Sequence, residues 1–490
     1  MKNNKLAAIL AAATMISVLA SCGDTAGNAD QTKETNTAAA SADTAEPSIY
    51  DVLQDNDYGG YTFRILNNLS NVAYINMGEA GQTGESLDDV IYQRNEKTAE
   101  TLNIQFQIEN REYYDTTETV SRVVSAGDDV YDMYTLDLSF MAGHATNGYL
   151  LNILDIESID LENPWWNKTA IDSVTISDYV YSLFGDLHVG YYEAFYPAVF
   201  NKSILNELSL DDPYQLVRDG KWTLDVMLEM IAAAKSDLDG DGKWTTSDRY
   251  GFSIYEENGS ICLLFTSNET IFEKDKDNLP VWNGLSDRFL TTYDKLVSTA
   301  FSVKHNNARS CAGEVAGSTL EKHRAMMHSG HSLFLFEPLG AVKNLRDVDY
   351  EIGIVPMPKF DEAQKDYRTY IFASANALAI PVTNPDPERT GVILEHMAAY
   401  SHETVREVFF DETLDFKYVQ DEEGQEMLDI MFSGGAFELA AVYNWGGIHG
   451  KILQRLNAGK NDVVSQVEKL VSKAEADMET TVDVFRNIGT

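Results

Sequence analysis

A run of acidic residues between positions 237 and 248 has the spacing of a calcium-binding loop. Aspartates occupy positions 1, 3, 5 and 12 of this stretch (Asp237, Asp239, Asp241 and Asp248), and Gly242 occupies position 6. In the EF-hand loop this alternation directs successive oxygen atoms at one ion, and the glycine permits the sharp turn between them. Calcium is favoured over magnesium because it accepts many oxygen ligands in a loose geometry.

The residues around this loop indicate a structural ion rather than a regulatory one. Lys243, at position 7, would supply a backbone carbonyl, and Asp248 replaces the glutamate that usually closes the loop with two oxygens. A helix predicted over residues 223–235 precedes the loop, but residues 250–252 have the composition of a strand, so the paired helices of a calcium sensor are not both evident. We expect one structural calcium ion, with a solvated acidic turn as the alternative.

Residues that could catalyse a reaction do not occur in any recognised spacing. His328 and His331 are three positions apart, but neither a third metal ligand nor an HExxH pattern accompanies them. The chain has no Walker loop and no dinucleotide-binding fingerprint. Because 77 residues are acidic, a catalytic pair of carboxylates cannot be singled out. The sequence therefore predicts no catalytic residues and a protein that is not an enzyme.

The N-terminal segment has the pattern of a lipoprotein signal peptide. Lys2 and Lys5 precede an apolar run over residues 6–20, which is too short to span a membrane. The run leads into Leu19-Ala20-Ser21-Cys22, which resembles the bacterial lipobox, in which the cysteine thiol receives a diacylglycerol and becomes the new N-terminus. An ordinary secretory signal followed by a chance cysteine is the alternative. We expect residues 1–21 to be removed and a lipid on Cys22 to hold the protein at the outer face of the bacterial cytoplasmic membrane.

The rest of the chain divides into a tether and a large folded part. Residues 22–47 are small or polar, so burial cannot offset the entropy of ordering them, and we expect a flexible tether. About 440 residues follow, which exceeds the roughly 250 to 300 at which single cores stop growing. At least two lobes are therefore expected.

Charge and cysteine usage exclude some classes of partner and site. With 37 basic and 77 acidic residues, the formal net charge of −40 repels nucleic acid and anionic lipid headgroups, so contact with the membrane is expected through the lipid anchor only. Besides Cys22 the chain has Cys262 and Cys311, which form no metal-binding pattern. Whether these two form a disulfide is left open.

Apolar runs of strand length alternate with helical patterns, which is typical of an α/β protein. Strands are expected at residues 61–66, 103–108, 130–135, 180–184, 198–200, 332–336 and 350–355. One helix is expected to begin at Ser86, a second to end near Gly148 and a third to begin at Asp386-Pro387. Two more are expected over residues 404–410 and 463–484.

Six short segments between residues 60 and 460 follow one another in an order that is typical of one protein family. They are residues 131–134, 148–153, 200–202, 220–223, 353–359 and 375–380. Each is weak evidence by itself, but together with the lipobox the set resembles the extracellular solute-binding proteins of family 1, the sugar-type binding lipoproteins of ABC importers. Some alginate-type relatives carry a similar calcium loop, so the acidic loop fits this resemblance.

The resemblance implies a two-lobed, periplasmic-binding-protein-like α/β fold, with crossing hinge segments and a ligand cleft between the lobes. Lobe 1 would comprise residues 48–187 with 367–412, and lobe 2 residues 188–366 with 413–490. The implied function is capture of a polar solute, an oligosaccharide, by a monomer that delivers it to the permease subunits of an ABC transporter. The alternative is a surface lipoprotein glycoside hydrolase that uses an unrecognised carboxylate pair.

The resemblance also implies which residues face the ligand. Proteins of this family stack aromatic faces on the C–H faces of sugar rings and bond the hydroxyls with carboxylates or amides. The matching positions here are Asp137, Tyr191, Tyr192, Glu193, Glu337, Tyr443 and Trp445.

Each of these positions has packing in the core as its alternative. Relatives often carry tryptophan where this chain has Glu337, which is therefore expected to bond a sugar hydroxyl or simply a backbone amide. Trp445 precedes two glycines that let a backbone approach closely, and it is the preferred stacking residue. Trp165, Trp166 and Trp222 are expected to pack in the core instead.

Overall fold

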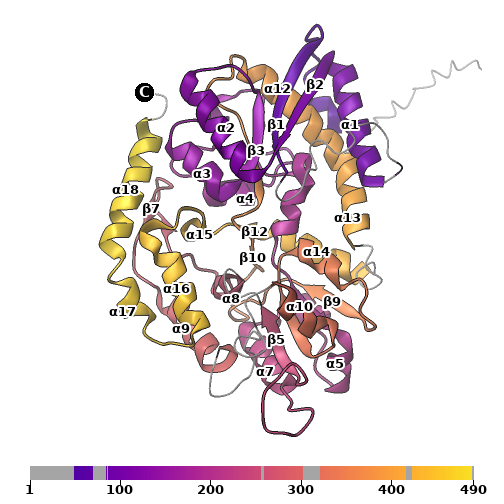
Figure 1. Cartoon of the computed structure of the whole chain (residues 1–490), viewed down its shortest axis with the longest axis vertical. Coiled ribbons are helices and arrows are strands. Elements are labelled where there is room, and N and C mark those ends of the chain that lie inside the picture. The colour runs from indigo at the N-terminus through magenta and orange to yellow at the C-terminus, as the bar shows by residue number, and fades with distance from the viewer. Residues whose placement is uncertain are drawn as a thin grey trace, which may run out of the picture. The chain divides into compact units, whose positions relative to one another are not determined.

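The computed structural model describes residues 49–69, 84, 86–254, 259–301, 320–414 and 422–487. The signal peptide, Cys22, the tether and Cys311 lie outside these residues, so the predictions made for them stay predictions. In the described part of the chain, no helix has both the length and the apolar character needed to cross a bilayer. Helices and strands alternate, which confirms the predicted α/β class (Figure 1).

The first sheet has the strand order β11-β3-β1-β2. Strands β1 (Tyr61–Asn68), β2 (Ile104–Arg111) and β3 (Met133–Asp137) run parallel, and β11 (Asn376–Ala379) joins β3 antiparallel from far along the chain. The helices connected to these strands are α1 (Ser86–Leu102), α2 (Tyr113–Ala126), α3 (Leu138–Thr146) and α12 (Pro387–Tyr400). Every residue of β3 is buried, as expected for a strand covered on both faces.

The second sheet has the strand order β5-β8-β4-β9. Strands β5 (Tyr250–Ile254) and β8 (Ser332–Phe336) are parallel, whereas β4 (Ala198–Asn201) is antiparallel to both β8 and β9 (Ile352–Val355). Its helices are α5 (Lys202–Glu207), α6 (Pro213–Arg218), α7 (Leu224–Ala234) and α10 (Leu320–His328).

The chain passes between the two sheets more than once. It leaves the first sheet after β3, builds the second from β4 to β9, and returns to the first with β11. The short parallel strands β10 (Thr369–Tyr370) and β12 (Gly435–Ala436) pair beside this crossing, and Phe195 bridges to Ile371. Two sheets joined by crossing segments make the fold two-lobed; the predicted lobe boundaries stay predictions.

The remaining elements connect or cover these sheets. They are α4 (Lys168–Val174), α8 (Ser260–Phe265), β6 (Glu273–Lys274), β7 (Pro280–Val281), α9 (Asp287–Lys295), α11 (Leu339–Val342), α13 (Arg406–Leu414), α14 (Glu422–Ser433), α15 (Leu439–Tyr443), α16 (Ile448–Asn457), α17 (Val463–Val467) and α18 (Val471–Asn487). Cys262 is a free, buried thiol on α8.

Local sequence signals account for several element boundaries. Asp386 caps α12 by accepting the backbone N–H of Arg389, and Pro387 follows at the first helical position, where its missing N–H costs nothing. Thr223 caps α7 in the same way. These two starts confirm the predicted helices.

The double tryptophan packs in the core, as predicted. Trp165 and Trp166 are buried, and their indole N–H groups donate to the two carboxylate oxygens of Glu395 at 2.8 and 2.7 Å. Trp222 is buried as well and donates to the carbonyl of Pro356.

The strand predicted at residues 180–184 is wrong. This segment makes only an isolated bridge, from Leu183 to Leu378, and is otherwise irregular. Its apolar run reflects burial beside the first sheet, and a short apolar run does not by itself distinguish a strand from another buried segment.

Candidate functional site

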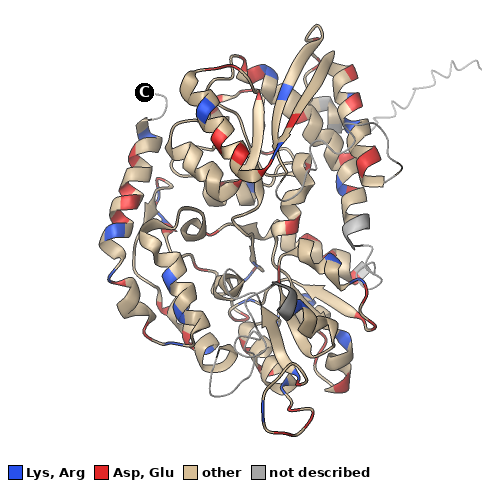
Figure 2. Ribbon diagram, in the orientation of Figure 1, with Lys and Arg blue, Asp and Glu red and all other residues tan. Residues whose placement is uncertain are grey.

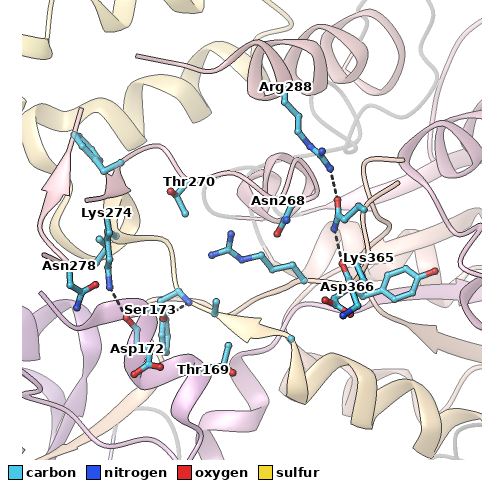
Figure 3. A pocket seen from close by; sticks show the side chains of 18 residues that line it. Thr169, Asp172, Ser173, Asn268, Thr270, Lys274, Asn278, Arg288, Lys365 and Asp366 are labelled. Carbon is cyan, nitrogen blue, oxygen red and sulfur yellow. Dashed lines mark hydrogen bonds between the residues drawn. The ribbon is translucent and has the colours of Figure 1, made fainter. Parts of the chain in front are cut away.

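A cavity of about 660 Å³ lies where the crossing segments meet (Figure 3). Its walls come from α4, from residues 268–278, from Arg288 on α9, from residues 364–368 before β10, and from residues 434–439 around β12. These segments are far apart in the sequence, and the pairing of β10 with β12 brings the last two together. A volume in this range is typical of small-molecule sites.

One part of the cavity wall carries hydroxyl and amide groups. Thr169 and Ser173 on α4, Asn278 beside the end of α4, and Asn268 and Thr270 all line it (Figure 3). The Ser173 hydroxyl donates to the carbonyl of Ala170 and accepts the backbone N–H of Phe437 at 3.0 Å, so its position is fixed. Fixed hydroxyls and amides can recognise the hydroxyl groups of a polar solute without further ordering.

Another part of the wall is aromatic or aliphatic, formed by Phe272, Tyr367, Phe437 and Leu439. The Tyr367 hydroxyl donates to the carbonyl of Val217 at 3.2 Å, which holds its ring in place. Aromatic faces attract the polarised C–H groups of a sugar ring, and the polar wall can bond its hydroxyl rim. The cavity therefore offers both kinds of contact that a carbohydrate needs.

Lys274 is a half-buried cation at one side of this cavity (Figure 3). Its ammonium group donates to the carbonyls of Asp172 and Thr175, both at 2.6 Å. Burial lowers its pKa to about 8, although the charge of Asp172 opposes the change. Lys274 thus remains mostly charged at neutral pH.

A second polar group lies at the carboxyl ends of β1 and β3, where ligands bind in open α/β sheets. The Asn68 amide donates to Asn376 at 3.1 Å and to Asp137 at 3.4 Å. Asp137 is 4% exposed, and burial raises the pKa of its carboxyl to about 7 against hydrogen bonds from Tyr113, Ser374 and Asn68. The structure places Asp137 after the third strand, as expected, and its contact with ligand stays a prediction.

Aromatic side chains beside Asp137 were missed at the sequence level. The Tyr113 ring packs edge-on against Phe140 at 4.6 Å and against Tyr114 at 5.0 Å. Tyr114 is 70% exposed, which is unusual for a large aromatic residue in a packed protein. The adjacent tyrosines at the start of α2 are the sequence feature that could have indicated this aromatic group.

Trp445 and Tyr443 lie together, with Trp445 buried and Tyr443 half-buried. Their rings stack at 4.7 Å and 4°, and Phe272 packs edge-on against Trp445 at 5.1 Å. Trp445 is 3% exposed, and its indole N–H donates to the hydroxyl of Thr481 on α18 at 3.0 Å. Both aromatic residues line a smaller cavity of about 340 Å³ between α3 and α18. The predicted role of Trp445 in stacking stays a prediction.

Tyr191 and Tyr192 are packed in the core, so the structure does not support the predicted ligand contact. Their rings lie 4.1 Å apart within the 3₁₀ segment Asp186–Ala194. The Tyr192 hydroxyl donates to Asp186 at 2.8 Å, and that of Tyr191 accepts from Asn167 at 3.1 Å. The hydroxyl groups of these two tyrosines find partners inside the protein, which holds this segment in the core.

The two predicted glutamates are held by basic residues. Glu337 is fully buried, and its carboxylate accepts from the Arg324 guanidinium at 2.8 Å. Glu193 is mostly buried and lies 3.6 Å from the ammonium of Lys343. The predicted ligand residues therefore do not line the central cavity, and Phe272, which does line it, packs against Trp445.

The acidic loop brings three of its predicted ligands together. Carboxylate oxygens of Asp237, Asp239 and Asp248 lie within 4.8 Å of one another. Gly242 has φ +76°, which favours glycine, and its N–H donates to Asp237 at 2.9 Å, so the predicted turn forms. Asp241 accepts the backbone N–H of Lys243 instead of joining this group. An all-oxygen group of this kind fits a hard cation such as calcium.

The two sheets and their crossing segments define the fold of the solute-binding proteins of ABC importers. The sequence matches no family model and no curated protein. Solved structures with this fold include a cyclo/maltodextrin-binding protein bound to maltotetraose, with 13% identity, a TM-score of 0.57, and coverage of 87% of this chain and 99% of the other.

Two further solved structures show the same fold. An extracellular solute-binding protein from Staphylococcus aureus bound to maltose has 12% identity and a TM-score of 0.55, covering 86% of this chain and 98% of the other. A sugar transporter from Rhizobium etli in an open conformation has 15% identity and a TM-score of 0.56, covering 86% and 99%. At these identities the likeness is one of fold.

Proposed function

We propose that this protein is a substrate-binding protein that captures an oligosaccharide and delivers it to the permease of an ABC importer. The observation that carries the proposal is the cavity of about 660 Å³ at the crossing segments, with hydroxyl and amide groups on one wall and aromatic groups on another. The same fold occurs in proteins whose structures hold maltotetraose and maltose. No residue group in the described part of the chain favours a second function.

Capture requires that the two sheets close around the solute. Crossing segments that leave β3 and return at β11 can act as a hinge, since a few residues between rigid elements absorb the change in backbone angles. Closure excludes water from the cavity, which strengthens each hydrogen bond to the solute. The permease would then recognise the closed form.

The proposal is tested by incubating the purified protein with a mixture of oligosaccharides. A thermal-shift screen finds ligands, because a solute at 100 times its Kd adds about 2.7 kcal/mol of stability. Mass spectrometry of the retained and free fractions then separates binding from hydrolysis. Intact glycan retained in a one-to-one ratio supports the proposal, and shortened products would indicate a glycoside hydrolase.

We further propose that Cys22 carries the lipid that holds the protein at the outer face of the cytoplasmic membrane. The lipobox motif at residues 19–22 and the polar tether behind it support this. A protein held there by a tether can meet both an extracellular solute and a permease in the bilayer.

We also propose that the loop at residues 237–248 binds one calcium ion with a structural role. The convergence of Asp237, Asp239 and Asp248 supports this, with Asp241 and the Lys243 carbonyl as additional ligands after a small rearrangement. The bound ion would fix the connection between α7 and β5, because loop ligands come from both of its ends. Asp248 is already anchored, since it accepts the N–H groups of Leu238 and Thr245.

A further inference from the structure

The central cavity differs in charge from the rest of the protein. The whole chain has 37 basic and 77 acidic residues, and its acidic residues are spread over the helices and loops (Figure 2). The cavity is instead lined by the four basic residues Lys274, Arg288, Lys365 and Arg368 and the two acidic residues Asp172 and Asp366. Asp172 also forms an ion pair with Lys168 at 2.8 Å. The cavity thus carries a local excess of positive charge.

Arg368 is the cation whose surroundings point most directly to a ligand. It is half-buried, its guanidinium lies 4.3 Å from the centre of the Phe265 ring, and its donors have no hydrogen-bond acceptor among the described residues. Burial lowers its pKa, although the charge of Glu438 opposes this. The N–H groups of a guanidinium without a protein acceptor can bond an anion in the cavity, and the partial burial of Arg368 would strengthen those hydrogen bonds.

Glu438 does not take this role. Its carboxylate accepts the N–H groups of Ile271 at 3.2 Å and Ala440 at 3.1 Å, and burial raises its pKa to about 7. Close to neutral pH it is therefore charged only part of the time. The guanidinium N–H groups of Arg368 therefore remain available to another acceptor.

Arg288 is held so that part of its guanidinium is available. Its Nε donates to the carbonyl of Ser267 at 2.6 Å, one terminal nitrogen donates to Gln364 at 2.8 Å, and the group lies over the Phe360 ring. Lys365, beside Gln364, is exposed and forms no ion pair among the described residues. Arg288 and Lys274 enter the cavity from different sides (Figure 3).

We propose that the solute bound in this cavity is an anionic sugar, recognised through an oxyanion group that accepts hydrogen bonds from Arg368, with Arg288 and Lys365 adding favourable charge. A guanidinium bonds a carboxylate or phosphate through two parallel N–H groups, and such charged hydrogen bonds are stronger than neutral ones. The oxyanion is the carboxylate of a uronate or the phosphate of a sugar phosphate. This inference rests on the proposed sugar-binding function.

The test compares ligands that differ only in charge. The full-length protein is incubated with a pool of uronate di- to tetrasaccharides, with the same pool after methyl esterification, with neutral maltodextrins and with hexose phosphates. Ultrafiltration and mass spectrometry measure which compounds are retained. We expect retention of one of the two anionic classes only, and binding that weakens as salt rises, because mobile ions screen the charges.

Three variants test which basic residue binds the anion. Arg368→Gln is expected to weaken binding of the retained anion about 10- to 100-fold, and Lys365→Gln about 2- to 5-fold because Lys365 is exposed. Arg218→Gln is the matched control: Arg218 pairs with Glu423 and Glu426, does not line the cavity, and its loss should leave binding unchanged. If Arg368→Gln does not fold, Lys365→Gln and the salt dependence give the answer.

The outcomes separate this inference from the proposed function. Retention of the ester pool as well as the acid pool, or of maltodextrins alone, overturns the inference and leaves the sugar-binding proposal standing. Retention of an anionic class that Arg368→Gln does not weaken also overturns it. Retention of no glycan in any arm overturns the proposed function, and the inference with it.

Discussion

Replacement of Trp445 by alanine tests whether this residue supports the fold or contacts the solute. The indole is 3% exposed, stacked on Tyr443 and packed against Phe272, so truncation leaves a cavity that neighbours cannot easily fill. Loss of a buried tryptophan side chain costs about 3 to 5 kcal/mol. We therefore expect Trp445→Ala to lower the free energy of unfolding by this amount.

The hydrogen bond from Trp445 gives a second, smaller perturbation. Its indole N–H donates to Thr481 at 3.0 Å, and Thr481→Val leaves this buried donor without an acceptor. An unsatisfied buried donor costs about 1 to 3 kcal/mol. Trp445→Phe keeps most of the ring but removes the donor, so its cost should lie between those of the other two variants.

Denaturant unfolding followed by circular dichroism measures the stability of each variant, and calorimetric titration measures its affinity for a solute found in the screen. If burial governs this residue, stability falls and the affinity per folded molecule changes little. A stability change below about 1 kcal/mol for Trp445→Ala, together with a loss of affinity of roughly thirtyfold, would refute this reasoning. Trp445 would then be the stacking platform that the sequence suggested.

Three further predictions concern the calcium loop, a buried carboxyl and the anchor. Chelation of calcium should lower the melting temperature of the wild type, and Asp237→Asn should abolish this response. A calcium ion at 100 times its Kd contributes about 2.7 kcal/mol to the stability of the fold. Identical melting curves of the wild type with and without chelator would contradict the site. Because the pKa of Asp137 is raised to about 7 in the fold, its contribution to stability is present below about pH 4 and is lost as pH rises through 7. Asp137→Asn should therefore gain stability relative to the wild type between pH 5 and pH 8 in urea melts, and a constant difference would count against the raised pKa. In a detergent phase partition of protein expressed in bacteria, Cys22→Ser should move the protein to the aqueous phase, and equal partitioning of both forms would exclude the lipid.

Short-range signals in the sequence were sufficient for much of the secondary structure. The run Ser332–Phe336 forms β8 as expected, and α12 begins at the predicted Asp386-Pro387 start. The acidic loop also follows from its sequence, because Gly242 and the alternating aspartates determine the turn within twelve residues. The cap of α12 and the turn of the loop are decided by interactions a few residues apart, whereas β8 is indicated by its apolar run and held by pairing with β4 and β5.

The candidate site depended on contacts that no local pattern indicates. Tyr191 and Tyr192 have the composition of a ligand-binding loop, but partners such as Asn167 and Asp186 hold them in the core. Glu337 accepts a hydrogen bond from Arg324, a pairing that no motif indicates.

The residues that line the central cavity carry no periodic or spaced signal of their own. Arg368 follows no motif, and it becomes a candidate only because β10 pairs with β12 and places it opposite residues 268–278. Local sequence determined the helix caps and the turn of the acidic loop, since hydrogen bonds between near neighbours decide them, and apolar runs such as Ser332–Phe336 indicated strands that pair with distant ones. Only the tertiary structure decided which side chains remain available to a solute, because burial and the pairing of segments such as β10 with β12 depend on contacts that the local sequence does not specify.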